Sequence, residues 1–350
     1  MKKYYTRACN FYYGSVSKEK IKKKLSLPLN GNNLISFDTI EIINRKYKKK
    51  VHIKKIKNQS NIVRKKIKDH IKLITIKKKI KGLNFSNLPI LMGIINLTPD
   101  SFSDGGKYNK KNYAYNHARY LIKKGCKILD IGGESTRPGA KDIDKKIEWK
   151  RIDKTLKKLK KINNFISIDT RKSWIMEKGI KNKVNLINDV SGFEYDLNTK
   201  NVLKKYKVPF IIHHMQGTPK NMQKKPNYEN VLLDIYDFFE NKIKEIRSLG
   251  IRHNNIILDP GIGFGKNLKH NMTLINNISI FHSLGFPIML GTSRKRFIKD
   301  LSGNNDSKER LGGTISSSLY AMMQGIQILR VHDINEVNQS IKVFKSLNFK

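Results

Sequence analysis

The chain has 350 residues, of which 38% are hydrophobic and 9% are aromatic, so it is long enough for one large domain with a buried core and a smaller second unit. No apolar run reaches the length of about 20 residues that a membrane-spanning helix requires, which excludes a helical membrane protein. The two cysteines, Cys9 and Cys126, lie far apart in the sequence and form no metal-type cluster, as is typical of a reduced, cytoplasmic protein.

The formal net charge is +43, from 71 Lys and Arg residues against 28 Asp and Glu residues. Such an excess of positive charge is typical of proteins that bind nucleic acids or anionic membranes. The basic residues are mostly Lys, however, and they are interleaved with Ile and Asn along the whole chain. We therefore interpret the charge as a compositional bias and expect no nucleic-acid partner. A polyanion-binding protein is the alternative.

Residues 1–85 form a Lys-rich N-terminal extension of unknown role. Short apolar stretches with alternating residues, at 34–37 and 71–76, predict a few strands, so the extension is expected to be small, basic and possibly β-rich. It has no apolar core of a secretory signal. A piece near residues 71–86 is expected to cover the bottom of the following domain, which comprises residues 86–350.

From residue 86 onward, short apolar runs alternate with amphipathic segments of helical period. The runs predict eight buried strands, at 89–95, 127–131, 165–168, 185–187, 209–212, 255–258, 286–290 and 327–331. Two of the helices are expected at 142–161, with Ile147 on the apolar side, and at 228–249. Eight strand–helix units in about 260 residues predict an α/β fold, a (β/α)8 TIM barrel, with an open doubly wound sheet as the alternative.

Polar residues follow each of these strands. They are Asn96, Arg137, Asp169, Asn188, His213 with His214, Asp259, Lys295 and His332. A single Asp or Asn after a strand is most often a helix cap or turn residue, and Asp169 before Thr170 suits that role. In a barrel, however, the loops after the strands build the active site. Polar residues at all the strand ends together are hard to explain by caps alone.

Arg330 and His332 lie two residues apart on the last strand, so their side chains point to the same side. An Arg that points into a barrel needs an anion. The first strand, its neighbour in a closed barrel, ends at Asn96, which can hold a divalent cation or an oxygen. These residues predict a phosphate or diphosphate pocket, and the alternative is that Arg330 pairs with a buried carboxylate such as Asp333.

Asp169, Asn188 and Asp259 present carboxylate and amide groups from three different strands. Such groups can bind the adjacent ring N–H and amino group of a fused aminopyrimidinone. Lys295 would donate a hydrogen bond from the opposite side. The alternative for Lys295 is a solvated helix residue, which is the commonest position of Lys in this chain.

Seven motifs in chain order carry a resemblance to a known family. They are 96–106 (NLTPDSFSDGG), 130–139 (DIGGESTRPG), 187–192 (INDVSG), 214–217 (HMQG), 259–266 (DPGIGFGK), 293–295 (SRK) and 330–333 (RVHD). Over residues 88–347 the chain resembles the dihydropteroate synthases, the sulfonamide targets of folate biosynthesis. The resemblance implies a transferase that joins 6-hydroxymethyl-7,8-dihydropterin diphosphate to 4-aminobenzoate and releases diphosphate in the presence of Mg2+.

The resemblance also implies roles for the residues that match the family's motifs. The catalytic residues would be Asn96, Lys295, Arg330 and His332, with Asn96, Arg330 and His332 on the diphosphate and Asn96 on Mg2+. The residues expected to bind the pterin are Asp169, Asn188, Met215, Asp259 and Lys295. Those expected around the aminobenzoate are Thr136, Arg137, Pro138, Phe264 and Ser293, and Gly265 is also expected to bind substrate.

A dissociative substitution is expected, because the aromatic amine is already neutral and the difficult event is breaking the bond to diphosphate. The loops after strands one and two, at 99–106 and 136–139, would close over the site. His213 and Arg296 depart from the family's pattern, so the rim of the aminobenzoate site is expected to differ.

A homodimer is expected to form through the helices near the last two strands, where small residues at 312–321 permit close packing. The nearest rival function is that of a methyltetrahydrofolate methyltransferase. Such an enzyme would share the pterin-binding carboxylates but has no use for an anion pocket of Arg330 and His332.

Overall fold

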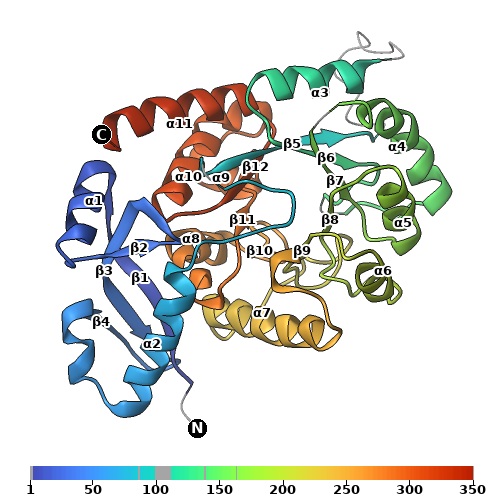
Figure 1. Cartoon of the computed structure of the whole chain (residues 1–350). Helices are drawn as coiled ribbons and strands as arrows, with labels where there is room; N and C mark the ends of the chain where they lie inside the picture. Colours follow the sequence, from blue (N-terminus) through green and yellow to red (C-terminus); the bar gives the residue numbers. More distant parts are fainter. Residues whose placement is uncertain (1–2, 86, 99–111, 138, 163, 350) are drawn as a thin grey trace.

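The computed structural model describes residues 3–85, 87–98, 112–137, 139–162 and 164–349. A small N-terminal sheet packs against one side of a larger barrel, and the helices of the barrel surround its strands (Figure 1). In the part of the chain that is described, no helix combines the length and the apolar character needed to cross a membrane.

The N-terminal extension is built around one long central strand. Its elements are β1 (Tyr5–Tyr13), α1 (Gly14–Lys22), β2 (Leu27–Leu29), β3 (Asn32–Ile43), β4 (Lys48–His52), η1 (Ile53–Asn58) and α2 (Asn61–Thr75). β3 pairs antiparallel with β1, β2 and β4. Phe37 and Ile40 of this sheet pack on Ile67 and Ile74 of α2, which lie on one helical face. The expectation of a β-rich extension is therefore confirmed.

The barrel contains the strands that the apolar runs predicted, each within a few residues. They are β5 (Ile90–Asn96), β6 (Ile128–Gly132), β7 (Phe165–Asp169), β8 (Leu186–Asp189), β9 (Phe210–His213), β10 (Ile256–Asp259), β11 (Met289–Leu290) and β12 (Ile328–Val331). The helices between them are α3 (Tyr113–Lys123), α4 (Lys145–Leu159), α5 (Ser173–Lys181), α6 (Thr199–Tyr206), α7 (Val231–Ser248), α8 (Leu268–Asn276), α9 (Arg296–Ser302), α10 (Leu311–Met323) and α11 (Ile334–Asn348), with short turns η3 (His253–Asn255), η4 (Ile278–Leu284) and η5 (Lys308–Arg310).

Neighbouring strands of the barrel run parallel, in the order β10-β9-β8-β7-β6-β5-β12-β11. The first strand β5 therefore lies beside the last strand β12, as a closed barrel requires. A bridge between Leu258 of β10 and Ile288, just before β11, joins the two ends of this order. The prediction of a (β/α)8 barrel is confirmed, and the open sheet is excluded.

The position of Ile147 was predicted wrongly. α4 spans Lys145–Leu159, and Ile147 on its first turn is 50% exposed. The buried stripe instead runs through Glu148, Ile152 and Leu156, because Glu148 forms an ion pair of 2.6 Å with the buried Lys172. Ile147 is one residue, or about 100°, away from that stripe. A buried ion pair thus took the place of an apolar contact.

Apolar side chains seal the bottom of the barrel, at the N-terminal ends of its strands. Ile80 and Phe85, from the segment between α2 and β5, pack against residues near the starts of the strands. These are Ile90, Met92, Ile128, Leu186, Ile211, Ile257, Met289 and Ile328. The expectation that a piece near residues 71–86 covers the barrel bottom is confirmed. The division of the chain at residue 85 stays a prediction.

Hydrogen bonds fasten the extension to the outside of the barrel. The Tyr5 hydroxyl donates to Asp237 of α7 at 2.8 Å, and the Tyr13 hydroxyl donates to the Met323 carbonyl at the end of α10 at 2.9 Å. The Asn30 amide donates to the Gly325 carbonyl at 3.2 Å. Because Tyr5 and Asn30 are buried, we regard the extension and the barrel as one packed body.

Candidate active site

The register of the parallel strands brings the predicted polar residues together at one end of the barrel. Asn96 of β5 pairs with Gly132 of β6, which in turn pairs with Asp169 of β7. Asp169 lies opposite Asn188 of β8. Because Gly132 has no side chain, Asn96 and Asp169 flank an open position: a Cβ there would lie 3.7 Å from Asn96 Oδ1 and 3.4 Å from Asp169 Cβ.

Arg330 is the charged centre of this end of the barrel. Its Nε donates to Asp130 Oδ2 at 2.7 Å, and its Nη2 donates to Asp169 Oδ2 at 2.8 Å. Arg330 therefore does pair with buried carboxylates, as the alternative expected, but they are Asp130 and Asp169; the example of Asp333 is wrong, because Asp333 accepts from Arg294. The guanidinium is therefore held in a fixed orientation by two carboxylates inside the barrel.

Asp130 is a site residue that the sequence analysis missed. It is fully buried in the middle of β6, where it accepts from Arg330 and also from the Asn188 amide at 3.0 Å. It thus fixes two residues that were predicted to bind different parts of the substrate. The available signal was a carboxylate inside an otherwise apolar strand, between Leu129 and Ile131.

Asp169 and Asn188 each have one buried acceptor atom that is left unpaired within the described part of the chain. Asp169 Oδ1 and Asn188 Oδ1 are buried and have no hydrogen-bond partner among the described residues. Asp169 does not cap α5, since the N-cap position is Lys172 and the Ser173 amide donates to Asp196 at 2.8 Å. Buried acceptors without donors are costly unless a ligand supplies the donors.

Burial controls the ionisation of the two predicted pterin-binding carboxylates. It raises the pKa of Asp169 to about 7, although the charge of Arg330 lowers it. Burial also raises the pKa of Asp259, against the charge of Lys295. Asp259 Oδ1 accepts from the Gly261 amide at 2.8 Å, in a turn where Gly261 has a φ of +67° and lies against the His214 carbonyl. Asp169 is thus able to take or lose a proton near neutral pH when a ligand binds.

Lys295 is not a solvated side chain. It precedes α9, donates to the Ile262 carbonyl and lies with Nζ 4.6 Å from the centre of the Phe264 ring. Burial lowers the pKa of Lys295 to about 8, although the negative charge of Asp259 raises it. Gly263 permits this approach, because a Cβ there would lie 3.2 Å from Lys295 Cδ. Lys295 is therefore a cation held beside Phe264 and the 259–265 loop.

His332 and Ser293 form a pair that the sequence analysis did not foresee. The Ser293 hydroxyl accepts from the His332 backbone amide at 3.2 Å, and it lies 3.0 Å from His332 Nδ1. The hydroxyl donates to Nδ1 in the tautomer that carries the ring proton on Nε2. Burial lowers the pKa of His332 to about 3, and the charges of Arg294, Arg330 and Arg137 lower it further. His332 is thus a neutral imidazole, which in that tautomer can donate to a ligand through Nε2.

The remaining predicted residues lie in the loops after the strands. Met215 and Phe264 are half-buried, and Gly265 is buried against the backbone of Gln216. Thr136 is half-buried and Arg137 is exposed in the loop after β6. The Gly139 amide of that loop donates to the Pro219 carbonyl at 3.0 Å. Pro138 and the loop at 99–106 lie outside the described residues.

His213 and Arg296, the two residues that depart from the family's pattern, lie in different surroundings. His213 is buried at the end of β9, with Nδ1 3.0 Å from the Val190 carbonyl and Nε2 3.9 Å from Asp259 Oδ2. Its ring also packs edge-on against Phe264, at 4.6 Å between ring centres. Arg296 is exposed on α9. His213 therefore contacts the predicted pterin side of the site rather than a solvent-exposed rim.

Asn96 is the candidate protein ligand for a divalent cation. Among the described residues, no cluster of three or more His, Cys, Asp or Glu side chains could hold a metal ion. Mg2+ commonly binds through one or two protein oxygens together with substrate phosphates and water. The single amide oxygen of Asn96, half-buried at the end of β5, fits such a shared site but no all-protein site.

Comparisons with known proteins agree with this geometry. Residues 92–332 match the family model described as "Pterin binding enzyme". The dihydropteroate synthase of Neisseria meningitidis serogroup C is 38% identical over 262 residues, which are 74% of this chain and 93% of that protein.

Two solved structures share the fold. The dihydropteroate synthase of Xanthomonas albilineans with 4-aminobenzoic acid superimposes with a TM-score of 0.71 at 32% identity, over 76% of this chain and 94% of that one. The enzyme of Clostridium difficile in the presence of pteroic acid gives a TM-score of 0.70 at 37% identity, over 77% of this chain and 100% of that one. The chain therefore belongs to the pterin-binding enzymes and, among them, to the dihydropteroate synthase family.

Proposed function

We propose that the polar end of this barrel joins 6-hydroxymethyl-7,8-dihydropterin diphosphate to 4-aminobenzoate and releases diphosphate, with each residue in the role described below. The observation that carries the proposal is the Arg330 guanidinium held between Asp130 and Asp169, beside the unpaired Oδ1 atoms of Asp169 and Asn188. A fixed cation next to unpaired acceptors suits a substrate that has both an anionic tail and a donor-rich ring. The similar enzyme of Xanthomonas albilineans was solved with 4-aminobenzoic acid and that of Clostridium difficile in the presence of pteroic acid, which contains a pterin ring.

The pterin ring would lie against β7, β8 and β10. Asp169 and Asn188 would accept from the ring N–H and the amino group, and Asp259 would accept from a second edge of the ring. Lys295 would donate to the ring carbonyl, and Met215 would pack on the ring face. Asp130 does not need to touch the ring, because its hydrogen bonds already orient Asn188 and Arg330.

The diphosphate would lie beside β5 and β12. Arg330 and the Nε2–H of His332 would donate to its oxygens as the bond to the pterin methylene carbon breaks. Asn96 would hold Mg2+, which would supply further positive charge beside the leaving diphosphate. Because these groups favour charge on the leaving group, we propose a dissociative substitution in which the electron-rich dihydropterin stabilises the cation on its methylene carbon.

The 4-aminobenzoate would enter over Phe264 and Ser293, with Thr136, Arg137 and Pro138 completing its site. Arg137 offers a cation for the carboxylate, and Ser293 offers its hydroxyl oxygen. The amine requires no general base because it is neutral at pH 7.

Incubation with pterin diphosphate and labelled 4-aminobenzoate tests the function. We expect equal amounts of labelled dihydropteroate and released diphosphate, and neither product when one substrate is omitted. Methyl transfer from methyltetrahydrofolate, without diphosphate release, would support the methyltransferase instead. Labelled product from the wild type but not from Arg330→Met would tie the activity to the anion pocket.

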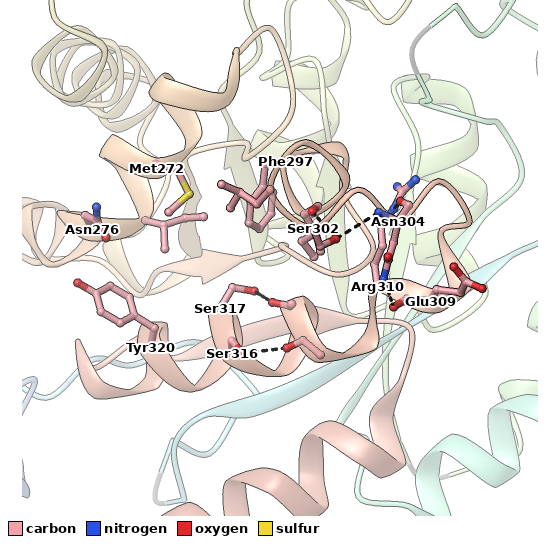
Figure 2. A pocket seen from close by; sticks show the side chains of 15 residues that line it. Met272, Asn276, Phe297, Ser302, Asn304, Glu309, Arg310, Ser316, Ser317 and Tyr320 are labelled. Carbon is pink, nitrogen blue, oxygen red and sulfur yellow. Dashed lines mark hydrogen bonds between the residues drawn. The ribbon is translucent and has the colours of Figure 1, made fainter.

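A homodimer is the second proposal, and it rests on an apolar groove between α8, α9 and α10 (Figure 2). The groove has a volume of about 530 Å3 and is lined by residues that include Met272, Ile298, Leu301, Gly313 and Tyr320. Leu301 and Tyr320 are 60% and 46% exposed. We propose a second copy of the chain as the occupant, because the exposed small residues Gly312 and Ser316 of α10 allow close helix packing. Light scattering should give twice the chain mass of 40.6 kDa, and Leu301→Arg should give the single mass.

A cytoplasmic location is proposed as well, because Cys9 and Cys126 are both buried and unpaired. Fractionation of the source cells should place the protein with soluble cytoplasmic markers. Recovery in an oxidising compartment would contradict this proposal.

A further inference from the structure

The segment between β6 and α4 carries Thr136 and Arg137, yet it has little structure of its own. Its described residues form no helix or strand, and Arg137 and Gly139 are exposed. Two backbone hydrogen bonds near its tip link Ala140 to Arg137 and Gly139 to Pro219, each at 3.0 Å. The position of this segment therefore depends on how its two ends are held.

Glu134 holds the first end. Its Oε1 accepts from the Ile143 amide at 3.1 Å and from Lys172 Nζ at 2.8 Å. Its Oε2 accepts from Nε and Nη2 of Arg171, at 3.1 and 2.7 Å. The Glu134 side chain is only 2% exposed, so these charge-assisted hydrogen bonds are shielded from water.

Arg171 also reaches the second end. Its Nη2 donates to Asp142 Oδ1 at 2.9 Å, so one guanidinium joins residues 134 and 142. The Tyr195 ring covers this guanidinium at 4.2 Å from its centre. Arg171 follows β7 and Tyr195 follows β8, so the loops after three neighbouring strands meet at this one cation.

We propose that Glu134, Arg171 and Asp142, together called the Arg171 bridge, hold the 134–142 segment in the conformation that places Thr136 and Arg137 against 4-aminobenzoate. This inference rests on the proposed function. The bridge residues are positioning residues, since none of them needs to touch the substrate. The bridge makes the loop after β6 depend on β7 and β8 for its shape.

The two carboxylates of the bridge differ in how they can be tested. Removing Glu134 would leave Arg171 and Lys172 buried without a partner, so such a variant could fail to fold. Asp142 is 60% exposed, and Arg171 keeps Glu134 when Asp142 is changed. Asp142→Asn therefore removes the charge from this end of the bridge, which weakens its contact with Arg171 and leaves the buried charges paired.

Steady-state kinetics of Asp142→Asn should show a rise of roughly three- to tenfold in KM for 4-aminobenzoate. KM for pterin diphosphate should change by less than about twofold, because the pterin residues lie on β7, β8 and β10. Asp142→Glu keeps the charge and should restore the wild-type KM. The matched control is Glu177→Gln, which breaks an ion pair with Lys205 on the outer side of α5 and should leave both KM values unchanged.

Hydrogen exchange of the full-length protein tests the bridge without turnover. Backbone amides at 135–142 should exchange faster in Asp142→Asn than in the wild type and in Glu177→Gln. Unchanged exchange would overturn the bridge, and faster exchange with an unchanged KM would overturn its role in placing the substrate. A wild-type enzyme without synthase activity would refute the proposed function instead, while the exchange result would still decide whether the bridge holds the segment.

Discussion

The two ends of the barrel are built from the same strands but contain opposite kinds of side chain. At the bottom, Ile80 and Phe85 pack against Ile128, Ile211 and other apolar residues near the strand starts. At the top, only a few residues further along the same strands, Asp130, Asp169, Asn188 and Arg330 lie together with several acceptor atoms unpaired. One end excludes water by packing, and the other keeps buried charge available for a ligand.

This difference shows how stability and function are divided along each strand. Apolar burial at the bottom supplies free energy of folding, whereas buried polar groups at the top reduce it unless they are paired. Asp130 offsets part of that cost by binding both Arg330 and Asn188. Substitutions at the two ends should therefore have opposite profiles, with stability affected at the bottom and catalysis at the top.

The largest effect is expected from Arg330→Met at the top. We expect kcat/KM to fall roughly a thousandfold, because the leaving diphosphate loses its fixed cation. Arg330 also has two buried carboxylate partners, so we expect a loss of about 3–5 kcal/mol in the free energy of unfolding at neutral pH.

Chemical denaturation at pH 8 and pH 5 checks the stability part of this prediction. Asp169 can take up a proton at the lower pH, so Arg330→Met should recover part of its lost stability there. Arg330→Lys, which keeps a charge but not the two-pronged contact, serves as the control. A fully stable Arg330→Met at pH 8 would show that the ion pairs with Asp130 and Asp169 do not form.

Ile211→Ala should show the opposite profile. Ile211 is fully buried at the bottom of the barrel, and its truncation should lower the free energy of unfolding by about 2–5 kcal/mol. Turnover per folded molecule and both KM values should stay unchanged. Urea denaturation with active-site titration measures both quantities, and Ile211→Val should give a smaller loss of about 1 kcal/mol.

Asp169→Ala and Asn188→Ala should weaken binding of the pterin diphosphate by roughly ten- to a hundredfold, because each leaves ring donors without an acceptor. Calorimetric titration measures this loss directly. His70→Gln serves as the control, because His70 is also buried but lies in α2 of the N-terminal extension. This variant should keep the wild-type affinity for pterin diphosphate. Unchanged pterin affinity in Asp169→Ala would remove this residue from the binding site.

The sequence predicted the strands well because buried parallel strands are short apolar runs that end in turn residues. It also predicted the strand-end residues such as Asn96, Asp169 and Asn188, since strand ends meet at one rim. It did not reveal the partner of Arg330, because the choice of Asp130 over Asp333 depends on strand register and side-chain direction. The prediction for Ile147 was wrong for a related reason: the buried position on the first turn of α4 is taken by Glu148, which pairs with Lys172.

The pH dependence of pterin diphosphate binding should be a smaller effect, and it tests the ionisation of Asp169 and Lys295 at the polar end of the barrel. Asp169, with a pKa raised to about 7, accepts most strongly from Arg330 and the pterin ring when it is ionised, so affinity should fall as the pH drops below 7. Lys295, with a pKa lowered to about 8, donates more strongly when it is charged, so affinity should also fall above pH 8. Titrations from pH 5.5 to 9 should give a bell-shaped curve, and Asp169→Asn should flatten its acid side.

The same pKa shift of Asp169 has a consequence for stability. Because its folded pKa lies above the unfolded value of about 3.9, its penalty is absent at low pH and grows as the pH rises toward 7. In the unliganded protein, Asp169→Asn should therefore reduce the loss of stability between pH 4 and pH 7. An identical pH profile in both proteins would show that Asp169 is ionised throughout this range.

A crystal structure with a non-reactive pterin diphosphate analogue, Mg2+ and 4-aminobenzoate tests the division between the two ends most directly. The site proposal predicts the pterin ring against Asp169 and Asn188, and the diphosphate between Asn96, Arg330 and His332. It also predicts an undisturbed apolar cluster around Ile80 and Phe85 at the other end. A ligand bound elsewhere, or a ring with no contact to Asp169 and Asn188, would contradict the assignment of this end of the barrel as the active site.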